Sequence, residues 1–217
     1  MGLDIYIHKI VKPRTKNVSS REDWEEIFKQ ADDDSRKELT KVYDGAVRSL
    51  KRTKPENYNA AYERNIKKIC AFSTYPQFHY KKLGVEYDYK DDKYIYTPVP
   101  VSVFEKERDE ILKDHYAPYE GYFRKVNFFY HYFAEKLVDE TAWIEREDLV
   151  DIIDRCEKVL EDHTLGPKLL PTQSGFFFGS TEYDDWYYND VKDCLKQMKG
   201  LLKGLKDDEQ LYVVMSW

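Results

Sequence analysis

The run SGFFFGSTEYDDWYYND, residues 174–190, holds the residue types best suited to chemistry in this chain. Glu182, Asp184 and Asp185 place three carboxylates within four residues, directly behind three phenylalanines flanked by glycines. If a helix begins here, the carboxylates lie in its first turn and complement the positive end of the helix dipole. They would also repel phosphate. We therefore expect a cation, a metal ion or a hydroxyl-rich ligand at this turn.

Neighbouring side chains can complete such a site. Ser180 or Thr181 can cap the helix, since a hydroxyl oxygen accepts a bond from an amide of the first turn. Tyr183, Trp186 and Tyr187 offer flat rings for stacking on a base or a sugar. The alternative is purely structural: a buried phenylalanine strand, a helix cap paired between Thr181 and Asp184, and a buried tryptophan.

Arg124 and Lys125 are the second candidate group, because they interrupt an otherwise apolar segment. Charges among apolar side chains are costly unless they are paired or bound. They either pair with Asp184 and Asp185 or bind an anionic group of a ligand or partner. An enzymatic alternative, a hydrolase or transferase, would use Glu182 or Asp184 together with Lys125.

The sequence matches none of four common catalytic or nucleotide-binding motifs. The chain has no P-loop, GxGxxG, HExxH or GxSxG motif. Its five histidines are isolated, with no pair at the i,i+4 spacing of a metal site, so we expect them at the surface or in the core. The sequence thus names no catalytic residue and no metal ligand, and the cofactor stays unknown.

Composition limits the classes of partner. Aromatic residues make up 16% of the chain, which argues against disorder. The net charge of −6 disfavours nucleic acid and anionic membranes. Residues 36–68 nevertheless carry ten basic and four acidic side chains, which form either a solvated helix face or a groove for an anionic partner.

The cysteines and the hydropathy of the chain indicate the compartment in which the protein resides. No apolar run approaches the ~18 residues that a membrane span requires, and the first ten residues lack the apolar length of a signal peptide. The three cysteines contain no C-x-x-C motif and suit buried positions in a reducing compartment. We expect a cytoplasmic protein.

The elements that must position these residues follow from periodicity. Alternation predicts strands over residues 3–10 and 209–217, a hairpin over 85–99 with a turn at 88–93, and a short strand at 175–179. Three-residue spacings predict helices from the caps Ser20, Ser35 and Ser102, from Pro55, over 147–162 and from 181 to about 203. Residues 120–137, apolar nearly all round, predict a long central helix.

Together these elements predict an α+β fold, mainly helical, with a small mixed sheet that includes the N- and C-terminal strands. We expect a single domain, residues 1–217, in which residues 19–116 can form a helical and hairpin subdomain.

Four stretches support a resemblance. The chain opens MGLDIYI, carries GYFRKVNFFYHYF in its middle, and ends with LLPTQSGFFFGSTEYDDWYYNDVKD and a final SW. It resembles a family of small bacteriophage and prophage proteins that open with MGLD and carry an LLPT-x-x-GFFFGST-x-YD-x-WY block. The family's F/W-R-K-x-N block corresponds here to Phe123, Arg124, Lys125 and Asn127. His131 is displaced by one position from the family pattern, and Tyr132 replaces a tryptophan.

The resemblance covers about a third of the chain and leaves residues 11–116 unmatched. It implies a phage or prophage context and a shared fold, and it adds Asn127 to the candidate ligand-binding residues. It implies no reaction. We therefore expect a non-enzymatic accessory protein that binds a small polar ligand or a host protein, with the hydrolase or transferase as the alternative.

Overall fold

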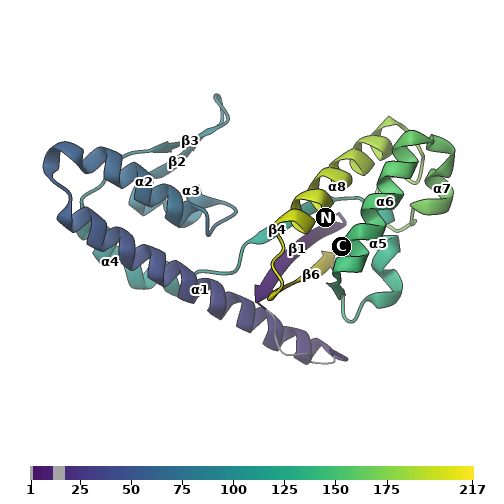
Figure 1. Ribbon diagram of the computed structural model, residues 1–217, viewed down its shortest axis with the longest axis horizontal. Coiled ribbons are helices and arrows are strands. Elements are labelled where there is room, and N and C mark those ends of the chain that lie inside the picture. The colour runs from purple at the N-terminus through teal and green to yellow at the C-terminus, as the bar shows by residue number, and fades with distance from the viewer. Residues whose placement is uncertain (1, 12–17) are drawn as a thin grey trace. The chain divides into compact units, whose positions relative to one another are not determined.

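The computed structural model describes residues 2–11 and 18–217 (Figure 1). The fold is α+β and mainly helical, as predicted. The chain divides into two compact units. The first contains residues up to Phe28 and from Tyr119 to Trp217, and the second contains Lys29–Pro118.

A four-stranded antiparallel sheet organises the first unit. Its order is β4 (Tyr119–Arg124), β1 (Asp4–Val11), β6 (Glu209–Ser216) and β5 (Thr141–Ile144). β1 pairs with β6 along its whole length, so the two ends of the chain meet in one sheet, as predicted. The strand β5 was not predicted, because its four residues are too few for a period to be recognised.

One face of this sheet carries the main core. Ile5 and Ile7 of β1 and Val213 of β6 are fully buried, since alternate residues of a strand face the same side. Helices α6 (Arg146–Glu161) and α8 (Asp185–Gly204) lie side by side and join this core (Figure 1). Both helices were predicted from their apolar stripes.

The opposite face is aromatic. Trp24, 2% exposed, packs its ring 4.8 Å from Trp143 and 6.0 Å from Tyr212, measured between centroids. The ring of Phe28 adds a third aromatic contact on this face, 5.5 Å from the ring of Tyr212. The first residues of α1 (Arg21–Arg52) therefore cover the side of the sheet that α6 and α8 leave open.

Short elements complete the first unit. They are α5 (Asn127–Phe133), η3 (Ala134–Lys136), η4 (His163–Leu165) and α7 (Gly166–Leu169).

The second unit has its own core. It is formed by α1 from residue 29, α2 (Tyr58–Cys70), α4 (Val101–Lys113) and the hairpin of β2 (Val85–Asp88) with β3 (Lys93–Tyr96). Shorter helices connect them: η1 (Pro55–Asn57), α3 (Pro76–His79) and η2 (Lys81–Leu83). The hairpin, its turn and α2 were predicted correctly.

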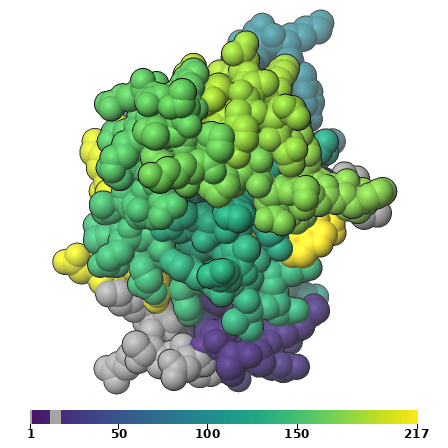
Figure 2. All heavy atoms as spheres, turned by 90° about the vertical axis from the view of Figure 1, so that its right-hand side faces the viewer, coloured from purple at the N-terminus to yellow at the C-terminus, as the bar shows by residue number. Residues whose placement is uncertain are grey.

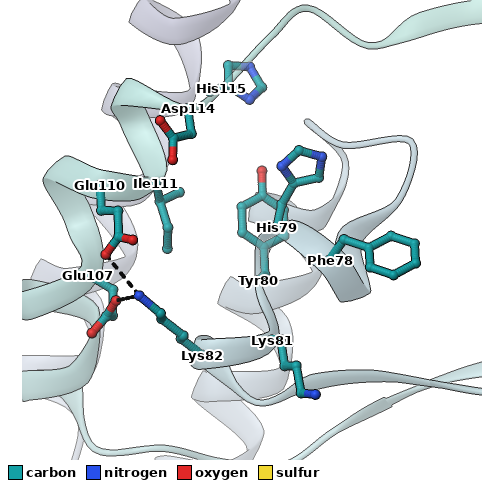
Figure 3. A pocket seen from close by; sticks show the side chains of 10 residues that line it. All are labelled: Phe78, His79, Tyr80, Lys81, Lys82, Glu107, Glu110, Ile111, Asp114 and His115. Atoms are coloured by element: carbon teal, nitrogen blue, oxygen red, sulfur yellow. Dashed lines mark hydrogen bonds and ion pairs between the residues drawn. The ribbon is translucent and has the colours of Figure 1, made fainter.

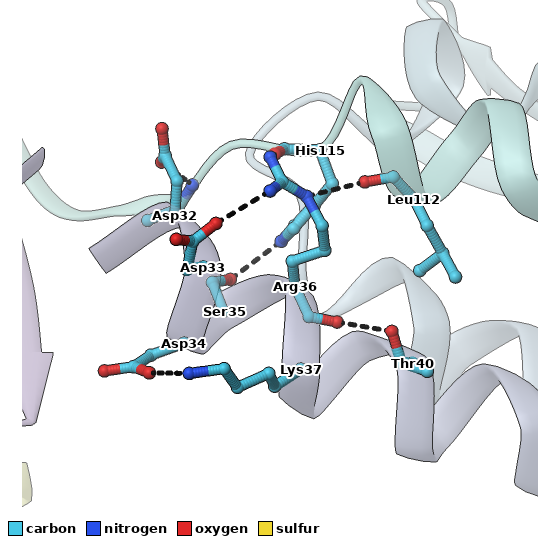
Figure 4. A network of polar contacts seen from close by, with 10 residues as sticks. Asp32, Asp33, Asp34, Ser35, Arg36, Lys37, Thr40, Leu112 and His115 are labelled. Atoms are coloured by element: carbon cyan, nitrogen blue, oxygen red, sulfur yellow. Dashed lines mark hydrogen bonds and ion pairs between the residues drawn. The ribbon is translucent and has the colours of Figure 1, made fainter. Parts of the chain in front are cut away.

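The predicted break before Ser35 is wrong, because α1 is continuous through it. The Ser35 hydroxyl does not cap a helix but lies 2.7 Å from Nε2 of His115 (Figure 4). Arg36 bonds the carbonyl oxygens of Leu112 and His115, at 2.8 and 3.1 Å. The polar run DDDSRKE has the composition of a helix end. It lies instead inside α1, where its side chains bond residues such as Leu112 and His115.

The long helix predicted over 120–137 is also wrong. Its first part is the strand β4, and Lys125, with φ of 60°, separates that strand from α5. Apolar residues on nearly every position fit a buried strand as well as a buried helix, so the pattern could not decide. Gly121, which disfavours a helix interior, was the available clue.

The capping box predicted at Ser102 is wrong too, since α4 begins at Val101 after Pro100 with no side-chain cap. The Ser20 and Asp23 pair is confirmed, with bonds of 3.1 and 3.3 Å exchanged between side chains and amides. The three cysteines are free and buried, as expected. Within the described residues, every helix is too short or too polar to cross a bilayer.

Candidate functional site

The candidate site is built around residues 171–184, here called the phenylalanine loop. Three other parts of the chain meet it. The Leu3 amide donates to the Phe177 carbonyl at 3.0 Å, and the Lys125 amide donates to the Leu3 carbonyl at 2.7 Å. The ring of Trp217 lies 5.7 Å from that of Phe178. The four stretches that carry the resemblance therefore converge on one surface of the first unit.

Asn127 holds the loop from beneath. It is 3% exposed, and its amide nitrogen donates to the carbonyls of Phe178 and Ser180, at 3.3 and 2.7 Å. Its side-chain oxygen accepts from the Gln173 amide at 3.4 Å. One buried side chain thus binds the loop on both sides of its phenylalanines. A role for Asn127 was expected from the resemblance alone, and the structure gives it backbone partners.

Glycines permit the close approach of the loop to the turn after β4. Gly179 has φ of 90°, a region that side chains rarely adopt, and a Cβ there would lie 3.2 Å from Cβ of Lys125. A Cβ at Gly175 would lie 2.7 Å from the ring of Phe178. The two glycines that flank the phenylalanines are therefore required by contact and by conformation.

The phenylalanines do not form the predicted strand. Residues 176–178 make a turn, in which the Phe178 amide donates to the Gly175 carbonyl at 3.2 Å. Phe178 is 7% exposed and packs on Tyr130 at 4.6 Å, whereas Phe176 is 95% exposed. A strand would have placed these two rings on the same face, so the prediction failed where the chain reverses.

The carboxylates at the end of the loop lie where a helix begins, and one of them caps it. Asp184, not Thr181, is the N-cap of α8, and its Oδ1 accepts from the Tyr187 amide at 3.0 Å. Ser180 Oγ accepts from the Glu182 amide at 3.1 Å, and the Thr181 carbonyl accepts from Thr172 at 3.1 Å. The cap predicted between Thr181 and Asp184 is therefore shifted to Asp184 alone.

The tyrosines expected to stack on a ligand are tied into the fold. The Tyr187 hydroxyl donates to the Leu170 carbonyl at 2.8 Å, and burial raises the pKa of this hydroxyl. The Tyr183 hydroxyl accepts from the Thr172 amide at 3.2 Å. Gln173 and Thr172, which the sequence did not single out, thus help to shape the loop.

The charged and aromatic groups exposed at the surface include two cations, Arg124 and Lys125, three carboxylates, and two rings. The carboxylates and rings are Glu182, Asp184, Asp185, Phe176 and Trp186. Within residues 2–11 and 18–217, no ion pair joins Arg124 or Lys125 to Asp184 or Asp185, so the predicted pairing is wrong for this part of the chain. Trp186 is 79% exposed, which contradicts the alternative of a buried tryptophan. In Figure 2 the yellow-green chain near residue 175 projects from the face of the first unit.

This geometry is convex and not concave. The loop presents an aromatic ring outward, and two cations lie on the adjoining turn. In the described part of the chain, no three histidine, cysteine, aspartate or glutamate side chains are placed to hold a metal ion. Compared with family models, with curated proteins and with solved structures, the chain matches none of them.

Proposed function

We propose that this chain is a non-enzymatic accessory protein, of phage or prophage type, that binds a host protein through the phenylalanine loop. The observation that carries the proposal is the 95% exposure of Phe176 on a loop whose backbone is bonded on both sides to buried Asn127. A phenylalanine left in water forgoes about 1.5–3 kcal/mol of burial. The bonds from Asn127 hold the backbone on both sides of the segment that carries this ring.

The shape favours a protein over a small ligand. Small molecules bind in concave sites that enclose them, whereas the loop projects from the surface (Figure 2). A projecting aromatic ring fits a pocket on another protein and contributes most when it is held in its bound conformation beforehand. Asn127 and Gly179 supply that preorganisation.

The charges indicate the chemistry of the partner. Arg124 and Lys125 are exposed on the turn that contacts Gly179. Glu182 and Asp185 are exposed in the same region, so this surface carries both signs of charge. An aromatic anchor with charges of both signs around it fits an apolar pocket with a charged rim, since complementary charges speed association and fix orientation. The free cysteines suit a reducing compartment, and we place the protein in the cytoplasm.

Site-specific photo-crosslinking in a bacterial host extract tests the proposal. A benzophenone amino acid replaces Phe176 in one protein and Phe78, 72% exposed in the second unit, in a matched control. We expect a discrete adduct from position 176 alone. Excess unlabelled wild type should suppress it, whereas excess Phe176→Ser protein should not. Identical adducts at both positions, or equal competition by Phe176→Ser, would overturn the proposal.

A further inference from the structure

The two units differ in charge. The first unit contains 17 basic and 25 acidic residues, whereas the second contains 18 basic and 16 acidic ones. The net charge of −6 therefore comes from the first unit, and it does not exclude an anionic partner for the second. The run 36–68 belongs to the second unit and holds ten of its basic residues.

Many cations of the second unit are paired with its own carboxylates. Lys82 bonds Glu107 and Glu110, each 2.9 Å from its ammonium (Figure 3). Lys37 of α1 lies 3.0 Å from Asp34, one turn away on the same helix (Figure 4). The charge of such cations is already balanced by a neighbour.

Four cations of the run 36–68 are not balanced in this way. Within residues 2–11 and 18–217, no hydrogen bond or ion pair engages them, and all four are exposed. We call them the cationic strip: Arg48, Arg52, Arg64 and Lys68.

Arg48 is the member of the strip with a carboxylate nearby. That carboxylate, Asp44, is already bonded by Arg108 at 2.7 and 3.1 Å. A terminal nitrogen of Arg48 lies 4.0 Å from where a Cβ of Gly45 would be. Its side chain therefore extends along α1, and its guanidinium stays available at the surface.

The cationic strip spans two helices that touch. The side-chain nitrogen of Asn65 in α2 donates to Oγ of Ser49 in α1 at 3.2 Å, and the two helices bury their apolar residues in one core (Figure 1). On each helix the two cations are four positions apart, so they lie one turn apart on the same face. Buried residues occupy one side of the contact between the helices, and the cations therefore lie on its solvent side.

We propose that the cationic strip binds an acidic helix of a partner protein, aligned with α1 and α2. Carboxylates at positions i and i+4 of such a helix are separated by a rise of about 6 Å, the same rise that separates the two cations on each helix of the strip. Three of the four cations are arginines, whose guanidinium pairs with a carboxylate through two parallel bonds. This surface has no part in the function proposed for the phenylalanine loop, so the two proposals fail separately.

The size and surroundings of the strip favour an acidic helix over nucleic acid. Proteins with strongly salt-dependent DNA binding contact about 6–10 phosphates, more than four cations can neutralise. Carboxylates also flank the strip, such as Glu63, paired with Lys67 at 2.5 Å, and Glu38, paired with Lys41 at 2.7 Å. A duplex, with a phosphate charge every ~1.7 Å along its axis, would meet these carboxylates as well.

Fluorescence anisotropy with a labelled peptide tests the proposal. The probe is an alanine-based helical peptide with two glutamate pairs at the i,i+4 spacing, and it is compared with its glutamine counterpart and with a short DNA duplex. We expect the glutamate peptide to bind the full-length protein at least about tenfold more tightly than the glutamine peptide, because only the former makes charge-assisted bonds. Its affinity should fall as salt is added, since the ion pairs are exposed. Equal binding of the two peptides, or tighter binding of the duplex at the same salt concentration, would overturn the proposal.

Variants locate the binding surface. The double variant Arg52→Gln, Arg64→Gln should weaken binding of the glutamate peptide about tenfold. The matched control is Lys37→Gln, Lys67→Gln, which removes the same charge from the same two helices at side chains that are already paired with carboxylates of their own helix. Circular dichroism reports the folding of each variant. Unchanged affinity in the first variant, or an equal loss in the control, would contradict the assignment.

Discussion

The phenylalanine loop and the core of the second unit treat polar and apolar groups in opposite ways. In the loop, the buried polar side chain Asn127 is bonded to three backbone groups, and an apolar ring, Phe176, stands in water. In the second unit, the hydroxyl of Tyr80 is buried and has no partner in the described chain. Each region leaves one group in an environment that does not suit it.

The difference shows two ways in which a fold can leave a group unsatisfied. Where the backbone is held by satisfied buried bonds, an exposed ring is stable in its place and available to a partner. Where a buried donor such as the Tyr80 hydroxyl is left without a bond, the fold carries the cost of its desolvation. Three substitution experiments and one pH experiment, from the largest expected effect to the smallest, sharpen this contrast.

Asn127→Ala should cause the largest loss. It leaves the carbonyls of Phe178 and Ser180 without their side-chain donor, and we expect the free energy of unfolding to fall by about 2–3 kcal/mol. Urea denaturation measures the change. Asn189→Ala is the matched control at an exposed position of α8 and should change stability by less than about 0.5 kcal/mol. Equal losses of stability in the two variants would show that Asn127 does not hold the loop.

Two glycine substitutions have opposite expected signs. Gly179→Ala forces a side chain into a conformation with φ of 90° and against Cβ of Lys125, which should cost about 1–3 kcal/mol. Gly200→Ala in α8 meets no atom within 4 Å and should stabilise the protein by about 0.5–1 kcal/mol through helix propensity. Thermal unfolding of both proteins checks the pair. A stable Gly179→Ala protein would show that the loop adapts freely.

Two tyrosine substitutions compare a satisfied with an unsatisfied hydroxyl. Tyr43→Phe removes the 2.8 Å bond to the Phe104 carbonyl and should cost about 1 kcal/mol. Tyr80→Phe removes a hydroxyl that has no partner in the described chain, so the unliganded protein should be unchanged or slightly more stable. Denaturation curves of the two variants decide. A loss in Tyr80→Phe as large as in Tyr43→Phe would mean that its hydroxyl is already bonded.

Acid should act on the two units with opposite signs. The pKa of His115 falls to about 4 in the folded protein, so the unfolded chain binds a proton first and stability of the second unit declines as pH drops from 6.5 through 4. The pKa of Asp190 in α8 is raised to about 6 by burial and by Asp193 and Asp184. The folded first unit therefore takes up the proton first and gains stability between pH 6 and 4.

Hydrogen exchange, corrected for the intrinsic effect of pH, measures both units in one experiment at pH 7 and pH 5. Protection near His115 should fall and protection near Asp190 should rise. His115→Gln should remove the first change, and Asp190→Asn the second. Changes of the same sign in both units would contradict the assignment.

The helices and strands that obey one clear period were predictable, as β6 and α6 illustrate. Residues 120–137 were not, because an apolar segment buried on all sides has no period to distinguish strand from helix. The run 32–38 misled because aspartate and serine also occur inside long helices when neighbours pair with them, as Asp33 does with Arg36. The distant partners of this run, such as His115 for Ser35, cannot be read from the local sequence.

The candidate site was predictable in its location but not in its construction. The sequence named Arg124, Lys125, Asn127 and the 180–186 turn, and the fold places the first three beside the loop. It could not show that Phe176 faces water, because the five residues GFFFG, 175–179, are compatible with a strand as well as with a turn. Nor could it show that the Tyr80 hydroxyl is buried without a partner, since that depends on the packing of the second unit.

The claim most central to this account is that the phenylalanine loop is held rigid before any partner arrives. Amide ¹⁵N relaxation of the unliganded protein tests it directly. The order parameters of Phe176, Phe177 and Phe178 should match the ~0.85 typical of rigid backbone, as in α8, and should fall in Asn127→Ala. Values below ~0.6 at these three amides in the wild-type protein would contradict the account.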